Sequence, residues 1–350
     1  MLVGLVTGER RLELREMPQP VPTPGKAVVE IAYCGICGTD LHAFQSGEPY
    51  NPAICGHEWT GRVSAVGAQT SHVREGDRVA IGAAVACGSC TTCRRGDAAH
   101  CETAFAGMIG IGPLAAPHGG FASAIAIDAS RLYHVDPKLD DVDAAILEPA
   151  TVAVHAVRRT GIRLGDSVLV LGAGPIGLLV LQAARAAGAG TVMLVEPQRS
   201  RRELGGSLGA DKLIDPGAAD VTEAVNAHIG AQGADVVIEC AGIPRTIGQA
   251  VSLVRRGGTV SLVGVPNGPA QIQAAEWLVK EVRVATSLAY LREEFDIAQG
   301  LVADGRMRCA ALHTSTVSLQ RIGDAFERLS APQATGGPPQ DIKVLVDPRL

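Results

Sequence analysis

The sequence predicts an α/β protein in which a doubly wound parallel sheet follows a β-rich first part. Three observations carry this prediction. The chain has 350 residues, which suggests more than one domain. Before about Ala145 the apolar runs are short and irregular, and after it apolar runs alternate with helical stretches. The 42 glycines suit a fold with many tight turns between strands and helices.

In the first part, short β-branched runs are bounded by Gly, Pro or Asp, as strands usually are. They predict strands at Ala27–Ala32 and Gly61–Val66, a turn at Gly76–Val79 that enters a further strand, and another strand opened by Gly119–Ala122.

In the second part, strand and helix patterns alternate, which predicts a parallel sheet covered on both faces. The expected strands are Val168–Leu171, Thr191–Val195, Asp235–Ile238, Thr259–Val263 and Val282–Ser287, and the expected helices are Ile176–Ala187, Arg199–Leu208 and Pro244–Val254.

The remaining chain should return to the first domain. It contains expected helices at Phe295–Ala303 and Ile322–Leu329, a loop at Thr335–Pro339 and a strand at Ile342–Val346. We therefore expect a first domain over residues 1–148, a second over 149–288, and a return segment over 289–350.

Charge and composition exclude several classes of partner. The net charge is −5, and the densest basic stretch is only Arg199, Arg201 and Arg202, so nothing favours nucleic acid or an anionic membrane. No apolar run is long enough to span a bilayer, and Glu9 interrupts the short apolar start, so we expect a cytoplasmic protein. Its nine cysteines should then be reduced, and clustered ones should bind metal or act in redox chemistry.

Directly after the first strand of the second part comes Gly172-Ala173-Gly174-Pro175-Ile176-Gly177, a G-x-G-x-x-G motif that opens a helix. In this context the motif predicts a Rossmann dinucleotide site, with the pyrophosphate at the helix N-terminus. Glu196 ends the next strand, where an acid binds ribose hydroxyls and repels a 2′-phosphate, so NAD is expected. The nearby Arg199, Arg201 and Arg202 keep NADP open.

Four cysteines are spaced C-x2-C-x2-C-x7-C, at Cys87, Cys90, Cys93 and Cys101. Four thiolates this close can surround one tetrahedral zinc ion, and such a closed site is structural. An iron–sulfur cluster is the alternative, because some ferredoxins share the first two spacings. The long third gap and the absence of a proline after Cys101 count against it.

A second set of donors is spread along the chain. Cys37 follows an expected strand, His57 and Glu58 lie about twenty residues later, and Glu148 precedes the second part. A mixed set of thiolate, imidazole and carboxylate is typical of an open, catalytic zinc site. Each of these residues is weak evidence when taken alone.

Together these motifs resemble the zinc-containing medium-chain dehydrogenases/reductases, the alcohol dehydrogenase superfamily. The resemblance rests on Gly35–His42, on Gly56–Glu58, on the four-cysteine loop and on Gly172–Gly177. Glu148-Pro149 is more similar to the polyol, sorbitol and threonine dehydrogenase branch. The resemblance implies a GroES-like catalytic domain beside the Rossmann domain.

The resemblance also implies a ligand set. Cys37, His57 and Glu58 would hold the catalytic zinc, and Glu148 would be either a fourth ligand or a group that holds a zinc-bound water. With the four-cysteine site this makes two zinc ions per chain.

Neighbouring residues receive further roles from the resemblance. Thr39 and His42 would relay the proton from substrate to solvent, and Asp40 would accept from the ring of His57. Cys34 and Cys55 would be bystanders.

The function implied is hydride transfer between NAD and a secondary alcohol, polyol or sugar alcohol. The alternatives are oxidation of an amino-acid alcohol, as by an L-threonine 3-dehydrogenase, and a non-catalytic NAD-binding protein. A homo-oligomer, tetramer or dimer, is expected. Further cofactor contacts are expected at Arg201, Cys240, Gly242, Val263, Val265, Ser287 and Leu288, and pocket residues at Phe44, Tyr50, Phe105, Met108 and Leu288.

Overall fold

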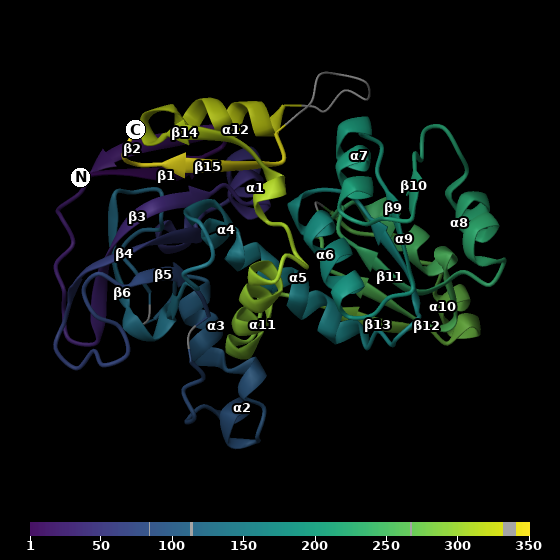
Figure 1. The fold of residues 1–350 in the computed structure, drawn as a ribbon, viewed down its shortest axis with the longest axis horizontal. Coiled ribbons are helices and arrows are strands. Elements are labelled where there is room, and N and C mark those ends of the chain that lie inside the picture. Colours follow the sequence, from purple (N-terminus) through teal and green to yellow (C-terminus); the bar gives the residue numbers. More distant parts are fainter. Residues whose placement is uncertain (84, 113–114, 267, 332–340) are drawn as a thin grey trace.

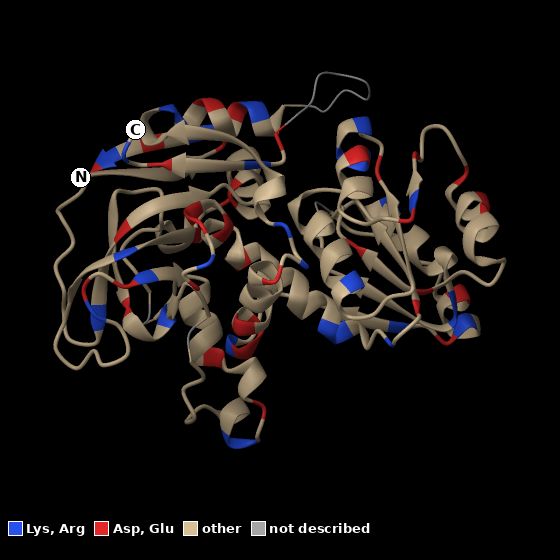
Figure 2. Ribbon diagram, in the orientation of Figure 1, with Lys and Arg blue, Asp and Glu red and all other residues tan. Residues whose placement is uncertain are grey.

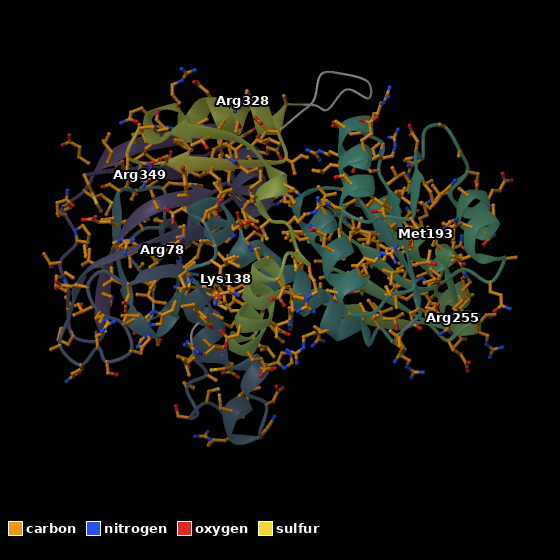
Figure 3. The ribbon with its side chains drawn as sticks, viewed as in Figure 1. Arg78, Lys138, Met193, Arg255, Arg328 and Arg349 are labelled. Atoms are coloured by element: carbon orange, nitrogen blue, oxygen red, sulfur yellow. The ribbon has the colours of Figure 1, made fainter. Side chains whose placement is uncertain are left out.

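The computed structural model describes residues 1–83, 85–112, 115–266, 268–331 and 341–350. The molecule has two halves, one built on a six-stranded sheet and one on a seven-stranded sheet, with helices between them (Figure 1). Side chains fill the space between sheets and helices in both halves (Figure 3). The predicted loop Thr335–Pro339 lies outside the described residues.

The six-stranded sheet is parallel throughout and has the order β10-β9-β8-β11-β12-β13. Its strands are β8 (Ser167–Leu171), β9 (Thr191–Val195), β10 (Lys212–Ile214), β11 (Ala234–Glu239), β12 (Val254–Leu262) and β13 (Arg283–Thr286). The central strands are apolar and buried along almost their whole length, as a sheet covered on both faces requires. The strand order reverses between β8 and β11, which is where doubly wound sheets bind ligands.

Five helices cover this sheet: α6 (Pro175–Ala186), α7 (Arg199–Ser207), α8 (Val221–Ile229), α9 (Pro244–Leu253) and α10 (Ala274–Lys280). Proline at the first position of α6 fits the helix start, because a helix leaves its first N–H groups without partners. The sequence patterns missed β10, α8 and α10. They also placed the start of β12 five residues late, because Arg255–Gly258 pairs irregularly with β11.

The seven-stranded sheet contains β14-β15-β3-β4-β5-β7, with β6 paired to β3. Its strands are β3 (Lys26–Gly35), β4 (Glu58–Val66), β5 (Arg78–Ile81), β6 (Ala124–Asp128), β7 (Leu132–His134), β14 (His313–Ser318) and β15 (Lys343–Asp347). β15 pairs antiparallel with β3, so the end of the chain joins the sheet of its first part. A hairpin of β1 (Leu2–Gly8) and β2 (Arg11–Glu16) was not predicted.

The helices of this half are α1 (Gly38–Ser46), α2 (Thr91–Arg94), α3 (Glu102–Met108), α4 (Asp141–Ala145), α5 (Leu147–Thr160), α11 (Arg292–Ala303) and α12 (Ile322–Ser330). Short 3-10 helices lie at η1 (Pro52–Ile54), η2 (Ala98–His100), η3 (Ala129–Arg131), η4 (Ala310–Leu312) and η5 (Leu319–Arg321). The chain passes between the halves through α5, which packs against α6 and α11 (Figure 1).

Aromatic packing ties the return segment to the first part. Phe326 of α12 contacts Phe44 and Phe121 edge to face, at ring centroid distances of 5.3 and 5.9 Å. All three side chains are buried, and burial of one phenylalanine contributes about 2 kcal/mol. The expectation that Phe44 lines a substrate pocket is therefore wrong, because the ring belongs to the core.

The surface carries acidic and basic residues interspersed over both halves (Figure 2). None of the helices within the described ranges is long and apolar enough to cross a membrane.

Candidate active site

Cys37, His57 and Glu58 form a compact group of metal-binding side chains, whose ligand atoms all lie within 4.8 Å of one another. Cys37 caps the N-terminus of α1, while Glu58 begins β4 and His57 directly precedes it. The antiparallel pairing of β3 with β4 sets Gly35 opposite Glu58, and this brings the two segments together. Residues separated by about twenty positions therefore meet because two neighbouring strands end at one edge.

The ring of His57 is held by the backbone. Its Nδ1 lies 3.0 Å from the carbonyl oxygen of Ile54 and 3.9 Å from Asp40 Oδ1. Ile54 is therefore the closer acceptor, and Nε2 is left for a metal. Asp40 instead accepts from Tyr50 Oη at 2.6 Å and from the backbone N–H groups of Cys37 and Gly56 at 3.0 and 3.1 Å.

The electrostatics of this group favour a bound cation. Burial disfavours the charged form of His57, yet the negative groups Cys37, Asp40 and Glu148 outweigh it and raise the pKa of His57 well above its usual value. A thiolate, an imidazole and a carboxylate are the donor types of an open zinc site. The residues present thus fit a catalytic zinc ion.

Lys343 of β15 is a site residue that the sequence patterns missed. Its ammonium group forms an ion pair with Glu58 Oε2 and donates to the carbonyl oxygen of Ile36 at 3.1 Å. Lys343 is 1% exposed and Glu58 is 2% exposed. Oε2 of Glu58 is thus engaged, which leaves Oε1 for a metal. A lone lysine inside the apolar run Lys343–Val346 was the available signal.

Glu148 lies in the first turn of α5, outside the compact group of three. Burial raises the pKa of Glu148 to about 7, while His57 opposes that rise and Glu58 adds to it. Tyr290 counteracts this rise in the pKa of Glu148. Tyr290 was not singled out by the sequence, because nothing in its neighbourhood marks a site.

The two predicted relay residues lie on the exposed side of α1. Thr39 Oγ1 is 3.7 Å from Cys37 Sγ, and His42 follows three residues later, on the same side of the helix. Cys34 and Cys55 are buried, and burial raises the pKa of both thiols. Both therefore stay protonated at neutral pH.

The four-cysteine loop forms a separate lobe around α2 and α3 that protrudes from the molecule (Figure 1). The Sγ atoms of Cys87, Cys90, Cys93 and Cys101 lie within 4.8 Å of one another. Backbone N–H groups point at them: Cys90 N donates to Cys87 Sγ and Cys87 N to Cys101 Sγ, both at 3.3 Å. Four sulfurs so arranged fit a tetrahedral zinc ion.

The glycine motif forms a tight cradle at the start of α6. Gly172 has φ +95°, and a Cβ on Gly177 would lie 1.9 Å from the carbonyl oxygen of Gly172. In front of Gly174 there is open space. The turn therefore offers backbone N–H groups at a helix N-terminus to a pyrophosphate, and the residues fit a dinucleotide.

Glu196 is buried at the end of β9. It accepts from Ala173 N at 2.8 Å and from Gln198 N at 2.9 Å. Arg202 donates to the carbonyl oxygen of Glu196 and pairs with Asp215, both at 2.8 Å. The guanidinium of Arg202 is thus held by contacts within the protein. The carboxylate of Glu196 borders the glycine turn.

Arg201 reaches from α7 to the other half of the molecule. Its Nη2 donates to the carbonyl oxygen of Asp341 at 3.2 Å. Its Nε is buried without a hydrogen-bond partner among the described residues.

The other predicted cofactor residues follow β11, β12 and β13, whose carboxyl ends share one edge of the sheet. Glu239, which was not predicted, holds the turn at Cys240–Gly242 by accepting from Ala241 N at 2.9 Å and Gly242 N at 3.0 Å. Val263 is partly buried, and Val265 and Leu288 are exposed. Ser287 Oγ is buried with no partner among the described residues, as expected of a group awaiting a ligand.

A parallel nucleotide-binding sheet joined to a β-rich half with two clusters of zinc-type donors defines the class of zinc-dependent dehydrogenases. Two family models match the chain: the alcohol dehydrogenase GroES-like domain over residues 23–137 and the zinc-binding dehydrogenase domain over residues 175–304.

The protein is 32% identical to the L-galactonate-5-dehydrogenase of Escherichia coli strain K12 over 91% of this chain and 92% of that one. It is 31% identical to the sorbitol dehydrogenase of Bacillus subtilis strain 168 over 76% of each. A solved zinc-binding dehydrogenase from Sinorhizobium meliloti 1021, bound to NADP, is 32% identical with a TM-score of 0.85 and 99% of both chains covered.

The chain therefore belongs to the zinc-binding medium-chain dehydrogenases, and the predictions of fold class, family and enzyme class are confirmed. The family gives this oxidoreductase a zinc ion and a nicotinamide cofactor.

Proposed function

We propose that this enzyme oxidises a secondary alcohol group of a polyhydroxylated substrate and passes the hydride to NAD, or runs the reverse reaction. The observation that carries the proposal is the open donor group of Cys37, His57 and Glu58. The names of the relatives, a galactonate dehydrogenase and a sorbitol dehydrogenase, support a polyol or sugar-derived substrate.

The residues of the site divide the work. A zinc ion held by Cys37, His57 and Glu58 supplies Lewis-acid polarisation of the substrate oxygen. Lys343 holds one oxygen of Glu58 and so fixes its orientation. Glu148 acts electrostatically on His57 and Glu58, which supports a role as a fourth ligand or as the group that holds a water beside the reacting group. Thr39, beside Cys37, starts the path by which a proton leaves toward His42 and solvent.

The preferred cofactor is NAD. The carboxylate of Glu196 borders the glycine turn, where the charge of a 2′-phosphate would be repelled. A solved relative is bound to NADP, so the preference of this enzyme for NAD over NADP needs a direct measurement. Initial rates with NAD and NADP at equal concentrations provide it, and a preference for NADP would contradict the assignment.

A second zinc ion in the four-cysteine lobe has a structural role, because four thiolates leave no open position for substrate. Metal analysis of purified protein is expected to find about two zinc ions per chain.

Kinetics test the proposed function directly. A panel of secondary alcohols, vicinal diols, hexitols, hexonates and L-threonine, each with NAD, is expected to show turnover of the polyhydroxylated compounds. Turnover of L-threonine alone would favour amino-acid alcohol oxidation. A protein that binds NADH and oxidises none of them would contradict an enzymatic role.

We also propose that residues 1–148 and 289–350 form the catalytic unit and residues 149–288 the cofactor unit, which the pairing of β15 with β3 supports. The enzyme assembles as a homodimer or tetramer, and the free edge of β13 supports this. Beside that edge, Leu278 is 79% exposed and Val279 70% exposed, and Val284 on β13 is also exposed. Light scattering is expected to report the mass of an oligomer. We further propose that the protein is located in the cytoplasm.

A further inference from the structure

Arg131 is a buried arginine whose charge the proposed mechanism does not use. It ends η3 and is 7% exposed. Its guanidinium donates to two neutral acceptors, from Nη1 to the carbonyl oxygen of Gly107 at 3.1 Å and from Nε to that of Gly82 at 3.4 Å. Within the described part of the chain it forms no ion pair. Arginine is almost never buried without a charged partner, because carbonyl dipoles do not replace a counter-ion.

The groups that act electrostatically on Arg131 include Glu148 of the candidate active site. The others are Tyr290, Asp128 and Tyr133.

The register of the strands places Arg131 near the ligand group. Thr60 of β4 pairs with Ala80 of β5, and Gly82, directly after β5, donates its N–H to the carbonyl oxygen of Arg131 at 2.9 Å. Arg131 therefore lies two strands across the sheet from Glu58, at the edge where the ligand group lies, and Glu148 acts electrostatically on both regions.

Asp128 is the acidic residue nearest to Arg131 in sequence, and it is already engaged. Its Oδ1 accepts from the backbone N–H of Ser130 at 2.9 Å and from Ser130 Oγ at 2.5 Å. These bonds cap η3 and hold the carboxylate away from ion-pair contact with Arg131.

A second arginine, Arg292, contacts Tyr133. Arg292, at the start of α11, has its Cζ 4.4 Å from the centre of the Tyr133 ring and donates to the carbonyl oxygen of Ser130 at 2.9 Å. It also forms no ion pair among the residues that the structure describes. Asp296, one turn along α11, is the acidic group that faces Tyr133 from this helix. Two arginines from different elements thus lie near Tyr133: Arg292 contacts its ring, and Arg131 is two residues earlier in the chain.

We propose that the substrate carries a carboxylate, bound by Arg131 with Arg292 adding positive charge nearby, so that the substrate class is polyhydroxy acids rather than neutral polyols. This inference rests on the proposed function. The planar fork of a guanidinium matches a carboxylate, and the bound anion supplies the missing counter-ion.

The charge of the surroundings favours a carboxylate over a phosphate ester. Glu148 and Asp128 both act on Arg131 and are themselves acidic. A carboxylate brings one negative charge into this setting, whereas a phosphate ester brings nearly two. One buried guanidinium therefore suits the monoanion.

The test compares acid and alcohol of the same configuration with the zinc-loaded wild-type enzyme and NAD. The pairs are gluconate with sorbitol, galactonate with galactitol and idonate with iditol. For at least one pair we expect kcat/KM for the acid to exceed that for the hexitol about tenfold or more, the usual value of a charged hydrogen bond. Equal kcat/KM values for hexitols and hexonates would contradict the proposed binding of a carboxylate and leave the proposed function intact. No turnover of any alcohol would overturn both.

Variants locate the recognition. Arg131→Gln is expected to lower kcat/KM for the acid about 10- to 100-fold, mainly through KM, and to change that for the hexitol less than about threefold. Arg131→Lys keeps the charge but loses the planar fork, so its kcat/KM for the acid should lie between those of the wild type and Arg131→Gln. Arg292→Gln is expected to lower kcat/KM for the acid about two- to fivefold.

Arg78→Gln is the matched control, since Arg78 pairs with Asp141 in the same half (Figure 3). If Arg131→Gln and Arg131→Lys lower acid and hexitol kinetics equally, Arg131 is structural and the proposal is overturned. Thermal melting of each variant separates loss of fold from loss of recognition. The comparison of acid with hexitol on the wild-type enzyme does not depend on the variants.

Discussion

The two clusters of zinc-type donors in this protein differ in their donor types, in their burial and in how the chain brings their members together. The four-cysteine lobe takes all its ligands from Cys87–Cys101 and is largely exposed. In the group of Cys37, His57 and Glu58, the first two are half-buried and Glu58 is buried, where it pairs with Lys343, 285 residues away in the chain.

The difference also appears in how each cluster is made ready for a metal. In the lobe, hydrogen bonds from Thr103 and Ser89 lower the pKa of Cys87 to about 5. In the group of Cys37, His57 and Glu58, the buried carboxylate of Glu58 pairs with the ammonium group of Lys343 in surroundings of low polarity, where an unpaired charge is costly. A site made from one short segment is therefore easy to recognise and locally stable, whereas a site made from distant segments depends on the whole fold.

The largest effect is expected from Cys37→Ala. Loss of Lewis-acid assistance worth several kcal/mol should lower kcat about 10³-fold or more, since each 1.36 kcal/mol is tenfold. Metal analysis should find one zinc fewer, with the lobe zinc retained. If the variant keeps both ions, the ligand assignment is wrong and Cys34 or Cys55 becomes the first suspect.

Next in size is Lys343→Met. Removing one member of a buried ion pair leaves Glu58 without its partner, which should lower the free energy of unfolding by about 3–5 kcal/mol. Urea denaturation of the zinc-loaded enzyme measures this. Lys138→Met is the control, since Lys138 is exposed (Figure 3) and its loss should cost under about 0.5 kcal/mol. Equal stability of the two variants would remove Lys343 from the site.

A smaller effect is expected from Gly35→Ala. The added Cβ would lie 2.4 Å from Glu58 Oε2, so the carboxylate must shift, and kcat/KM should fall about tenfold. Gly38→Ala is the matched control, because a Cβ there meets nothing within 4 Å. A harmless Gly35→Ala would mean that the position of Glu58 is not critical.

The smallest effect on turnover is expected from Cys101→Ser in the lobe. It should remove one zinc and lower the melting temperature, while kcat falls by less than about tenfold, because a closed structural site takes no part in chemistry. Loss of activity as large as in Cys37→Ala would erase the distinction between the two clusters.

The same contrast explains what the sequence could predict. The glycine motif, the four cysteines and the alternating strands are local patterns, and the structure has each of them where expected. Lys343, Tyr290 and Arg131 carry no local pattern, since their surroundings come from chain distant in sequence. Phe44 was misplaced for the same reason, because its partner Phe326 comes from the return segment.

The route of the chain sets an order of events during synthesis. Glu58 leaves the ribosome 285 residues before Lys343, and in the interval the whole nucleotide-binding sheet is made. A nascent chain that stops before β15 lacks the ammonium group that pairs with Glu58. This ion pair of the catalytic half therefore forms only after the cofactor unit has been made.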